Sequence, residues 1–348
     1  MIPLLELQDV TMDFPVKSPV LRRTIGRVRA VDDVDMRLDR GETLGVVGES
    51  GSGKTTVGRI ALGLLEPTQG RVLVEGKDVT NLGGSDRLAM RRRLQFVFQD
   101  PYSSLDPFSP IGDAIEEPLR THRVGDRSSR RTRVGELLGL VGLHPDVTVR
   151  YPREFSGGQL QRIAIARALA LDPQLIVLDE PVSSLDVSTQ ADVVNLLGQL
   201  QSDLGVAYLF IAHDLAVVDH ISTRIAVMYL GQVVELGTGE AVVARPKHPY
   251  TLALLSAVPG REAASRAERP RILLRGDLPS PLSTVQGCRF HTRCPFVMDI
   301  CREIDPQPFT APDGSTATCH LHTEGPVLAG SSVTELPLPQ LSASASTP

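Results

Sequence analysis

Eight consecutive residues, from Gly48 to Thr55, have the types and the order needed to bind a phosphate group. They read Gly-Glu-Ser-Gly-Ser-Gly-Lys-Thr and fit the pattern G-x-x-x-x-G-K-[ST]. Glycines allow the backbone to curl so that several N–H groups point at one anion, and a helix that begins there adds the positive end of its dipole. We therefore expect Lys54 to reach the β- and γ-phosphates of a nucleoside triphosphate and the Thr55 hydroxyl to bind Mg²⁺.

Asp179 and Glu180 are the second pair of residues with evident chemistry, because they end the apolar run 175–178. A continuous apolar strand is typical of a parallel sheet that helices cover on both faces, and ligands bind at the carboxyl ends of such strands. Asp179 is therefore placed to hold Mg²⁺ through its water shell, and Glu180 to orient or deprotonate an attacking water. A surface turn would also explain two adjacent acids, but the phosphate-binding loop favours the chemical interpretation.

Three further side chains lie at the ends of predicted strands. Gln99 follows residues 94–98 and can contact Mg²⁺ or the attacking water, and His213 follows residues 206–212 and can hydrogen-bond a γ-phosphate. Phe14 ends an edge strand predicted over residues 4–14 and can stack on an adenine ring. Taken singly, His213 is as well explained by a structural histidine and Phe14 by a core aromatic.

Ser156-Gly157-Gly158-Gln159 precedes a helical segment that we expect over residues 160–171. Ser156 can cap this helix, and Ser-Gly-Gly at a helix start is a second anion site by the same physics as the first.

The elements that must position these residues alternate between strands and helices, which predicts an α/β fold. Residues 44–47 predict a buried strand before the phosphate-binding loop, and residues 56–65 predict a helix after it. Residues 111–171 are helical in pattern, and six arginines between positions 120 and 133 indicate a solvated helix face. The other segments are strands at 31–38 and 71–75, a hairpin at 225–236, a short helix at 247–258, and a basic loop at 16–29.

Composition describes an ordinary globular protein of one large or two modest domains. The chain has 348 residues, 41% hydrophobic and 22% charged, and its net charge of -5 gives no general case for nucleic-acid binding. No apolar run approaches the ~18 residues that a membrane-spanning helix needs. The first residues lack the basic and apolar regions of a signal peptide, so we expect the chain in the cytosol.

All four cysteines lie in one short segment, at positions 288, 294, 301 and 319. In a cytosolic protein such clustering favours metal binding over disulfides. The spacing fits neither the paired C-x2-C of a zinc ribbon nor the ferredoxin runs, so it leaves the type of metal open, with free thiols as the alternative. His291 and His320 lie nearby and are interpreted as bystanders.

Taken in order, these motifs resemble those of the ATP-binding-cassette (ABC) ATPases over residues 4–240. The resemblance implies an α/β P-loop core with a mostly parallel sheet, helices on both faces and an antiparallel β edge, and an α-helical signature subdomain at about 105–171. Phe155 to Gln159 match the signature usually written LSGGQ, and Ser184 to Asp186 match the D-loop. Gln99 matches the Q-loop, Asp179 and Glu180 the Walker B pair, and His213 the switch histidine.

The resemblance also implies that two ATPase domains form a head-to-tail sandwich, in which Ser156 and Gly158 complete the partner's site. It assigns Glu180 as the base with His213 and Gln99 beside it, and Thr55, Gln99 and Asp179 as Mg²⁺ contacts. The implied ATP-binding residues are Phe14, Gly48, Glu49, Ser50, Gly51, Ser52, Gly53, Lys54, Thr55, Thr56, Ser156, Gly157, Gly158, Gln159 and Asp186.

The tail narrows the resemblance, because His248-Pro249-Tyr250-Thr251 and the cysteine segment look like the oligopeptide/dipeptide (also nickel) importer branch. Within it, the chain resembles the F-type ATP-binding subunit, which pairs with a related D-type subunit. The implied system adds two integral membrane permeases and an extracytoplasmic peptide-binding lipoprotein, and it places this chain peripherally on the cytoplasmic face of the cell membrane. No nucleic-acid partner is expected.

Some members of that branch hold a [4Fe-4S] cluster, which the resemblance assigns to Cys288, Cys294, Cys301 and Cys319, with zinc as the second choice. The predicted units are an ATPase domain at 1–240, a C-terminal extension at 241–322 and a disordered tail at 323–348.

Rival functions remain at this point. The same type of complex can import nickel or another small solute. A non-transport ABC ATPase acting on DNA or ribosomes is the other alternative, but the chain has neither a long coiled coil nor a second head.

Overall fold

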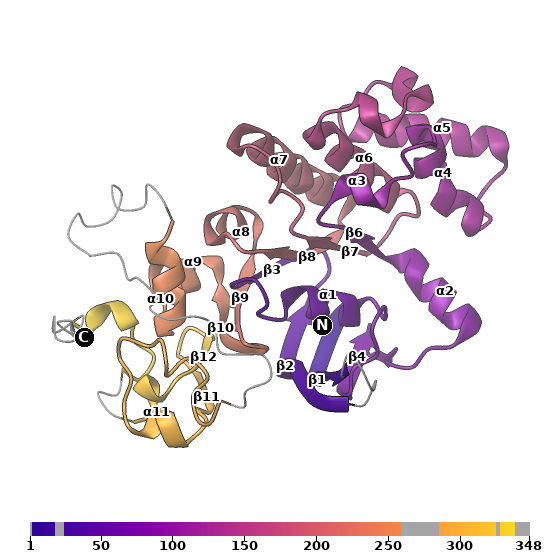
Figure 1. Ribbon diagram of the computed structural model, residues 1–348. Coiled ribbons are helices and arrows are strands. Elements are labelled where there is room, and N and C mark those ends of the chain that lie inside the picture. Colours follow the sequence, from indigo (N-terminus) through magenta and orange to yellow (C-terminus); the bar gives the residue numbers. More distant parts are fainter. Residues whose placement is uncertain (1, 18–23, 259–284, 325–327, 338–348) are drawn as a thin grey trace.

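The computed structural model describes residues 2–17, 24–258, 285–324 and 328–337 (Figure 1). Its main sheet has the spatial order β11-β12-β10-β9-β3-β8-β7-β6. The strands from β9 to β6 run parallel, and β10, β12 and β11 continue the sheet in antiparallel fashion. Their bounds are β3 (Thr43–Val47), β6 (Leu94–Val97), β7 (Leu175–Asp179), β8 (Ala207–Ala212), β9 (Arg224–Tyr229), β10 (Gln232–Thr238), β11 (Pro308–Thr310) and β12 (Thr316–Thr318).

A second, antiparallel sheet has the order β2-β1-β4-β5, formed by β1 (Leu5–Lys17), β2 (Thr24–Leu38), β4 (Gln69–Val74) and β5 (Lys77–Asp78). Helix α1 (Lys54–Ala61) lies between the two sheets and contacts both β2 and β8 (Figure 1). Apolar side chains of β1, β2, α1 and the main sheet form one core there. This confirms the predicted α/β architecture with a mostly parallel sheet and antiparallel strands beside it.

The N-terminal strand predictions need correction. Strand β1 pairs with both β2 and β4, so it is not an edge strand, and it continues past Phe14. Residues 24–29, expected in a basic loop, belong to β2, while residues 18–23 lie outside the described part of the chain. Arg27 and Arg29 are exposed while the intervening Val28 is more covered. The arginines therefore follow the period-two alternation of a half-exposed strand. Their clustered charge had favoured the prediction of a loop.

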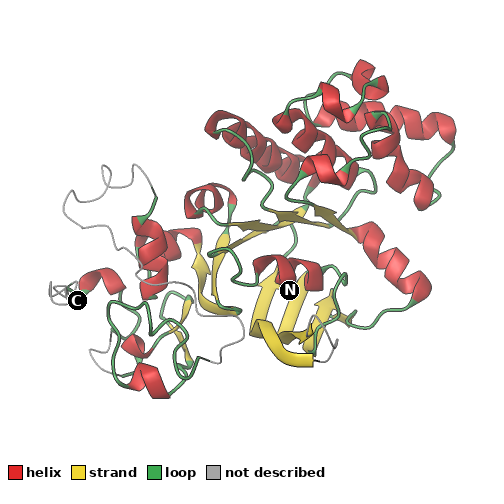
Figure 2. Cartoon of the chain, viewed as in Figure 1, coloured by secondary structure: helices red, strands yellow, loops and turns green. Residues whose placement is uncertain are grey.

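The expected helical region forms a separate group of helices beyond the sheet (Figure 2). It contains α4 (Ile111–Thr121), α5 (Arg127–Leu140), α6 (Gly157–Leu169) and the 3₁₀ turns η1 (Pro145–Val149) and η2 (Pro152–Glu154), and the short helix α3 (Pro101–Ser104) precedes it. Ile115, Leu137 and Leu160 are fully buried in the core that these helices share with the main sheet. The arginine run lies mostly on the solvated side, although Arg130 also pairs with Glu116 at 2.8 Å.

The remaining helices are α2 (Gly84–Arg93), α7 (Val187–Leu204), α8 (Leu215–Ile221), α9 (Gly239–Ala244), α10 (Pro249–Ser256), α11 (Ile300–Glu303), and the 3₁₀ turns η4 (His320–His322) and η5 (Val333–Glu335). Among the described residues, no helix combines the length and the apolarity that crossing a membrane would require.

The C-terminal extension is built onto the ATPase core rather than linked loosely to it. Its hairpin β11–β12 pairs with β10, where Glu235 lies opposite Ala317. The prediction of a disordered tail from residue 323 is wrong for residues 328–337, because Val333 is buried and its N–H donates to the Pro246 carbonyl at 2.9 Å. Residues 338–348 lie outside the described part.

Candidate nucleotide-binding site

The phosphate-binding loop connects β3 to α1 and approaches its surroundings closely. A side chain at Gly53, where φ is 100°, would place its Cβ 2.2 Å from the Ala30 carbonyl oxygen. At Gly48 a Cβ would lie 2.2 Å from the Met228 carbonyl oxygen. Only glycine fits these positions, so the loop can pack closely against the neighbouring backbone.

Lys54 is held inside this loop. Its side chain is 4% exposed, and Nζ donates to the carbonyl oxygens of Gly48 at 2.7 Å and Glu49 at 2.8 Å. Burial lowers the pKa of Lys54, while the carboxylates of Glu180, Asp179 and Glu49 oppose that shift. The loop therefore carries a buried cation at its centre, which suits the binding of polyphosphate.

The two carboxylates predicted at the end of β7 have separate surroundings. The Thr55 hydroxyl donates to Asp179 Oδ1 at 2.9 Å, and burial raises the pKa of Asp179. Glu180 adopts a left-handed backbone, with φ of 48°. Thr55 and Asp179 thus bring together two oxygen ligands of the kind that Mg²⁺ prefers.

Glu180 contacts two other predicted residues, Gln99 and His213. Gln99 Nε2 donates to Glu180 Oε2 at 2.9 Å, and His213 Nδ1 lies 3.4 Å from the same oxygen. These side chains follow the neighbouring parallel strands β6, β7 and β8. The carboxyl ends of parallel strands share one edge of the sheet, which explains why residues distant in sequence converge there.

A cavity of about 1230 Å³ joins these groups. At one end it is lined by Lys54, Thr55, Gln99, Glu180 and His213. The other end is lined by Asp13, Arg27, Val28, Arg29, Ala30 and Leu230, together with Leu254 and Arg289 of the extension. The cavity thus runs from the phosphate-binding loop to a wall built from β1, β2 and the extension.

Phe14 does not line this cavity, but its neighbour does. Phe14 is half-buried and lies opposite Val28 in the antiparallel pair β1–β2, so both side chains lie on the same face of that sheet. Val28 is a cavity-lining residue. The structure therefore places Phe14 beside the cavity rather than in its wall.

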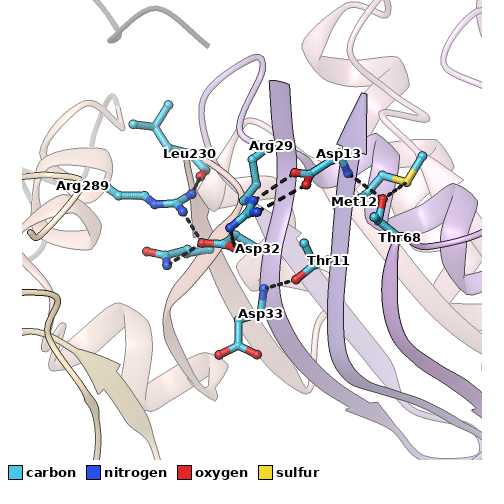
Figure 3. A network of polar contacts seen from close by, with 10 residues as sticks. Thr11, Met12, Asp13, Arg29, Asp32, Asp33, Thr68, Leu230 and Arg289 are labelled. Atoms are coloured by element: carbon cyan, nitrogen blue, oxygen red, sulfur yellow. Dashed lines mark hydrogen bonds and ion pairs between the residues drawn. The ribbon is translucent and has the colours of Figure 1, made fainter. Parts of the chain in front are cut away.

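Ion pairs fix the wall formed by the second sheet (Figure 3). Arg29 binds Asp13 and Asp32, each at 3.0 Å. Arg289 of the extension binds the same Asp32 and the carbonyl oxygen of Leu230 (Figure 3). Asp32 thereby joins β2, the turn after β9 and the cysteine segment in one network.

The signature residues lie away from this cavity. Ser156 caps α6 by accepting from the Gln159 N–H at 3.3 Å, and Gln159 Oε1 accepts from the Ser156 N–H at 3.0 Å. A Cβ at Gly158 would lie 2.3 Å from Thr189 Cγ2, because the starts of α6 and α7 pack together. Asp186 caps α7, and hydrogen bonds from Ser188 and Thr189 lower its pKa. None of Ser156, Gly157, Gly158, Gln159 and Asp186 lines the cavity beside the phosphate-binding loop.

The four cysteines converge in the extension without forming a single-ion site. The Cys288 N–H donates to the Cys301 carbonyl at 2.9 Å, and all four are free thiols. Burial raises the pKa of Cys288 to about 11 and that of Cys319 to about 12, and neighbouring cysteines add to both shifts. Within the described residues, no three of these sulfur atoms lie within 4.8 Å of one another. A zinc ion with Zn–S bonds of about 2.3 Å needs closer sulfurs, so a preformed zinc site is not found.

Two contacts to the phosphate-binding loop were missed by the sequence reasoning. The Glu49 N–H donates to the Tyr250 hydroxyl at 2.8 Å, and Arg293 Nη1 donates to both Glu49 carboxylate oxygens at 3.1 and 3.0 Å. Tyr250 belongs to the His-Pro-Tyr-Thr segment that marked the extension, but nothing local in sequence indicates its contact with a loop 201 positions away.

Comparison with known proteins agrees with this geometry. Residues 31–183 match the ABC transporter family, and residues 234–301 match the oligopeptide/dipeptide transporter C-terminal region. The chain is 50% identical to the oligopeptide transport ATP-binding protein AppF of Bacillus subtilis, over 92% of this chain and 98% of that protein.

Solved structures agree as well. The dimeric post-hydrolysis state of the ATP-binding cassette MJ0796, bound to ADP and Pi, is 30% identical with a TM-score of 0.60, covering 67% of this chain and 98% of that one. CbiO1 of Clostridium perfringens, part of the ABC transporter complex cbiONQ, is 25% identical with a TM-score of 0.61, covering 70% and 92%. The chain therefore belongs to the family of ABC transporter ATP-binding subunits, in the branch that carries the oligopeptide/dipeptide transporter C-terminal region.

Proposed function

We propose that this protein hydrolyses ATP to power the import of peptides across the cytoplasmic membrane, as a peripheral subunit on the cytoplasmic face. The observation that carries the ATPase part is the convergence of Gln99, Glu180 and His213 at the end of the cavity that holds Lys54 and Thr55. The peptide substrate is supported by the relative AppF and by the matched C-terminal region. We assign residues 1–240 to the ATPase domain and 241–322 to the extension.

The described side chains suggest a division of labour during hydrolysis. Lys54 and those N–H groups of residues 48–56 that make no hydrogen bond within the protein bind the phosphates. Thr55, Asp179 and Gln99 would hold Mg²⁺, which would offset the negative charge of the phosphates. Glu180 accepts the proton of the attacking water, and Gln99 orients its carboxylate through the 2.9 Å hydrogen bond. His213 lies close enough to Glu180 to sense the γ-phosphate beside it.

The signature residues act, on this proposal, in the site of a second and related ATPase subunit. Ser156, Gln159 and Asp186 are exposed and lie away from the cavity of their own chain. Val187, at the start of α7, is 82% exposed. An exposed helix N-terminus with glycines is suited to close over the γ-phosphate bound by a partner. A heterodimer, in which each ATP lies between one phosphate-binding loop and the other signature, uses both halves.

Contact with two permease subunits is supported by three exposed aromatic side chains in the segment around Gln99. Phe98, Tyr102 and Phe108 are 47%, 52% and 84% exposed. All three lie between β6 and α4, where the helical group joins the sheet. Large exposed aromatic side chains often mark protein contacts. A permease helix bound there would change position when Gln99 moves. An extracytoplasmic binding lipoprotein would deliver the peptide to the permeases.

Co-purification tests this assignment. Tagged protein extracted from its native membrane is expected to be recovered with a second ATP-binding subunit and two integral membrane proteins. Peptides that stimulate ATP turnover in the reconstituted complex would be identified as the transported substrate. Stimulation by Ni²⁺ alone would identify nickel as the substrate instead. Stable recovery with ribosomes or DNA in place of membrane proteins would contradict the transport function.

For the cysteine segment we propose a [4Fe-4S] cluster held by Cys288, Cys294, Cys301 and Cys319. Its support is the presence of four buried or half-buried free thiols in one short segment. A cluster binds each thiolate to a different iron, so it needs a wider spread of sulfur atoms than one zinc ion does.

Protein purified without oxygen is expected to be coloured and to contain about four irons per chain. A Cys301→Ser variant removes one of the proposed ligands and should lose most of the iron. Colourless protein with one zinc per chain would contradict the cluster.

A further inference from the structure

The C-terminal extension contacts the phosphate-binding loop at Glu49. Its N–H donates to the Tyr250 hydroxyl at 2.8 Å, and its carboxylate accepts two hydrogen bonds from Arg293 Nη1, at 3.1 and 3.0 Å. The Arg293 side chain is 8% exposed and that of Glu49 is 25% exposed. Because the pair is largely shielded from water, its interaction is stronger than that of a surface ion pair.

The position of Glu49 makes this pairing necessary. Glu49 lines the same cavity as Lys54, and its negative charge acts on the Lys54 ammonium. A carboxylate at that place would repel the phosphates of ATP. Arg293 neutralises that charge from the side of the extension.

Tyr250 and Arg293 are held in place by an aromatic cluster. The Tyr229 ring lies 4.7 Å from Tyr250 and 5.2 Å from Phe290, centroid to centroid, and the Arg293 guanidinium carbon lies 5.9 Å from the Tyr229 centroid. Phe290 is 1% exposed. Since Tyr229 ends β9, which pairs with β3, the cluster connects both residues to the strand that leads into the phosphate-binding loop.

The buried carboxylate of Glu235 fixes the helix that carries Tyr250. It accepts from the N–H groups of Lys247 and His248 at 2.8 and 2.9 Å, at the start of α10. Burial raises the pKa of Glu235 to about 7, against the effect of these hydrogen bonds. Helix α10 and its tyrosine are therefore positioned by the core sheet.

We propose that Arg293 and Tyr250 are positioning residues of the ATP site, which set nucleotide affinity by neutralising and orienting Glu49. This inference rests on the proposed binding of ATP at the loop from Gly48 to Thr55. It makes the extension part of the nucleotide site rather than an appendage to it.

Equilibrium binding of a fluorescent ATP analogue with Mg²⁺ to the purified full-length chain tests the proposal. Arg293→Gln is expected to weaken binding about tenfold, because Glu49 is left charged and unpaired. Glu49→Gln in the same chain is expected to restore affinity to within about threefold of the original, because the uncompensated charge is gone. The defect of Arg293→Gln should shrink as ionic strength rises. Tyr250→Phe keeps the ring and should cost a few-fold in affinity.

Arg133→Gln is the matched control, since it removes a paired arginine on the helical group, where Arg133 contacts Glu136 at 3.2 Å. It should bind the analogue like the unaltered protein. Two results would overturn the proposal: unchanged affinity in Arg293→Gln, or a loss that Glu49→Gln does not rescue although the thermal midpoint is preserved. Because the measurement needs no permease, its outcome is independent of whether the complex transports peptides.

Discussion

Replacing Glu180 by glutamine is expected to slow ATP turnover of the assembled transporter by about 10²- to 10⁴-fold while nucleotide binding is retained. Glutamine keeps the size of the side chain and can still accept from Gln99 through its amide oxygen. It cannot take a proton from the attacking water. Turnover should be measured as phosphate release from the reconstituted complex, and binding by equilibrium titration.

The same variant should trap the ATP-bound dimer with the partner subunit, which size-exclusion chromatography in ATP and Mg²⁺ would detect. The control is Glu136→Gln, which alters a carboxylate that is 56% exposed on α5. Unchanged turnover in Glu180→Gln would refute Glu180 as the base. Loss of nucleotide binding together with turnover would show that Glu180 supports the loop instead.

Ser156→Asp is expected to reduce hydrolysis by the assembled complex at least about a hundredfold without weakening ATP binding to the isolated chain. Aspartate caps a helix as well as serine does, so α6 should keep its N-terminal geometry. The substitution adds a negative charge where we propose that the partner's γ-phosphate docks. Repulsion at that short distance opposes closure of the dimer.

Ser156→Asn separates charge from shape in this experiment. Asparagine also caps helices and is neutral, so this variant should hydrolyse ATP within a few-fold of the original complex. If both variants were fully active, the signature would not contact nucleotide in trans. If Ser156→Asp weakened binding in the isolated chain, its action would lie in the chain's own site.

The sequence by itself predicted that Gln99, Glu180 and His213 follow strands beside the phosphate-binding loop, and the structure has them there. Thr55 lies 2.9 Å from Asp179, and Glu180 meets both Gln99 and His213, although these residues are far apart in the chain. Gln99, Glu180 and His213 lie together because each follows a strand, and the ends of neighbouring parallel strands share one edge of the sheet. Hydrophobic pattern and motif spacing are sufficient to identify such strands.

Predictions of local structure from the sequence were wrong where polar residues lie in paired strands or in ordered segments of the tail. Arg27 and Arg29 suggested a loop, but Arg29 pairs with Asp13 across β1 and β2 and stays compatible with a strand. Phe14 was predicted to stack on an adenine ring, and this stays a prediction; it lies opposite Val28, which lines the cavity. Residues 328–337 were expected to be disordered, and contacts such as that of Val333 with Pro246 order them. In each case a contact with a segment distant in the chain determines the local structure. Local composition gives no sign of that contact.

The phosphate-binding motif from Gly48 to Thr55 was evident from residue types alone, because its chemistry lies in closely spaced glycines followed by a lysine and a hydroxyl. Only the tertiary structure brings the cysteine segment onto that loop, where Arg293 reaches Glu49 across 244 positions of chain. This contact depends on how β10, β12 and the aromatic cluster around Tyr229 dock the extension onto the core. Such docking arises from the packing of whole surfaces and leaves no periodic or local mark in the sequence.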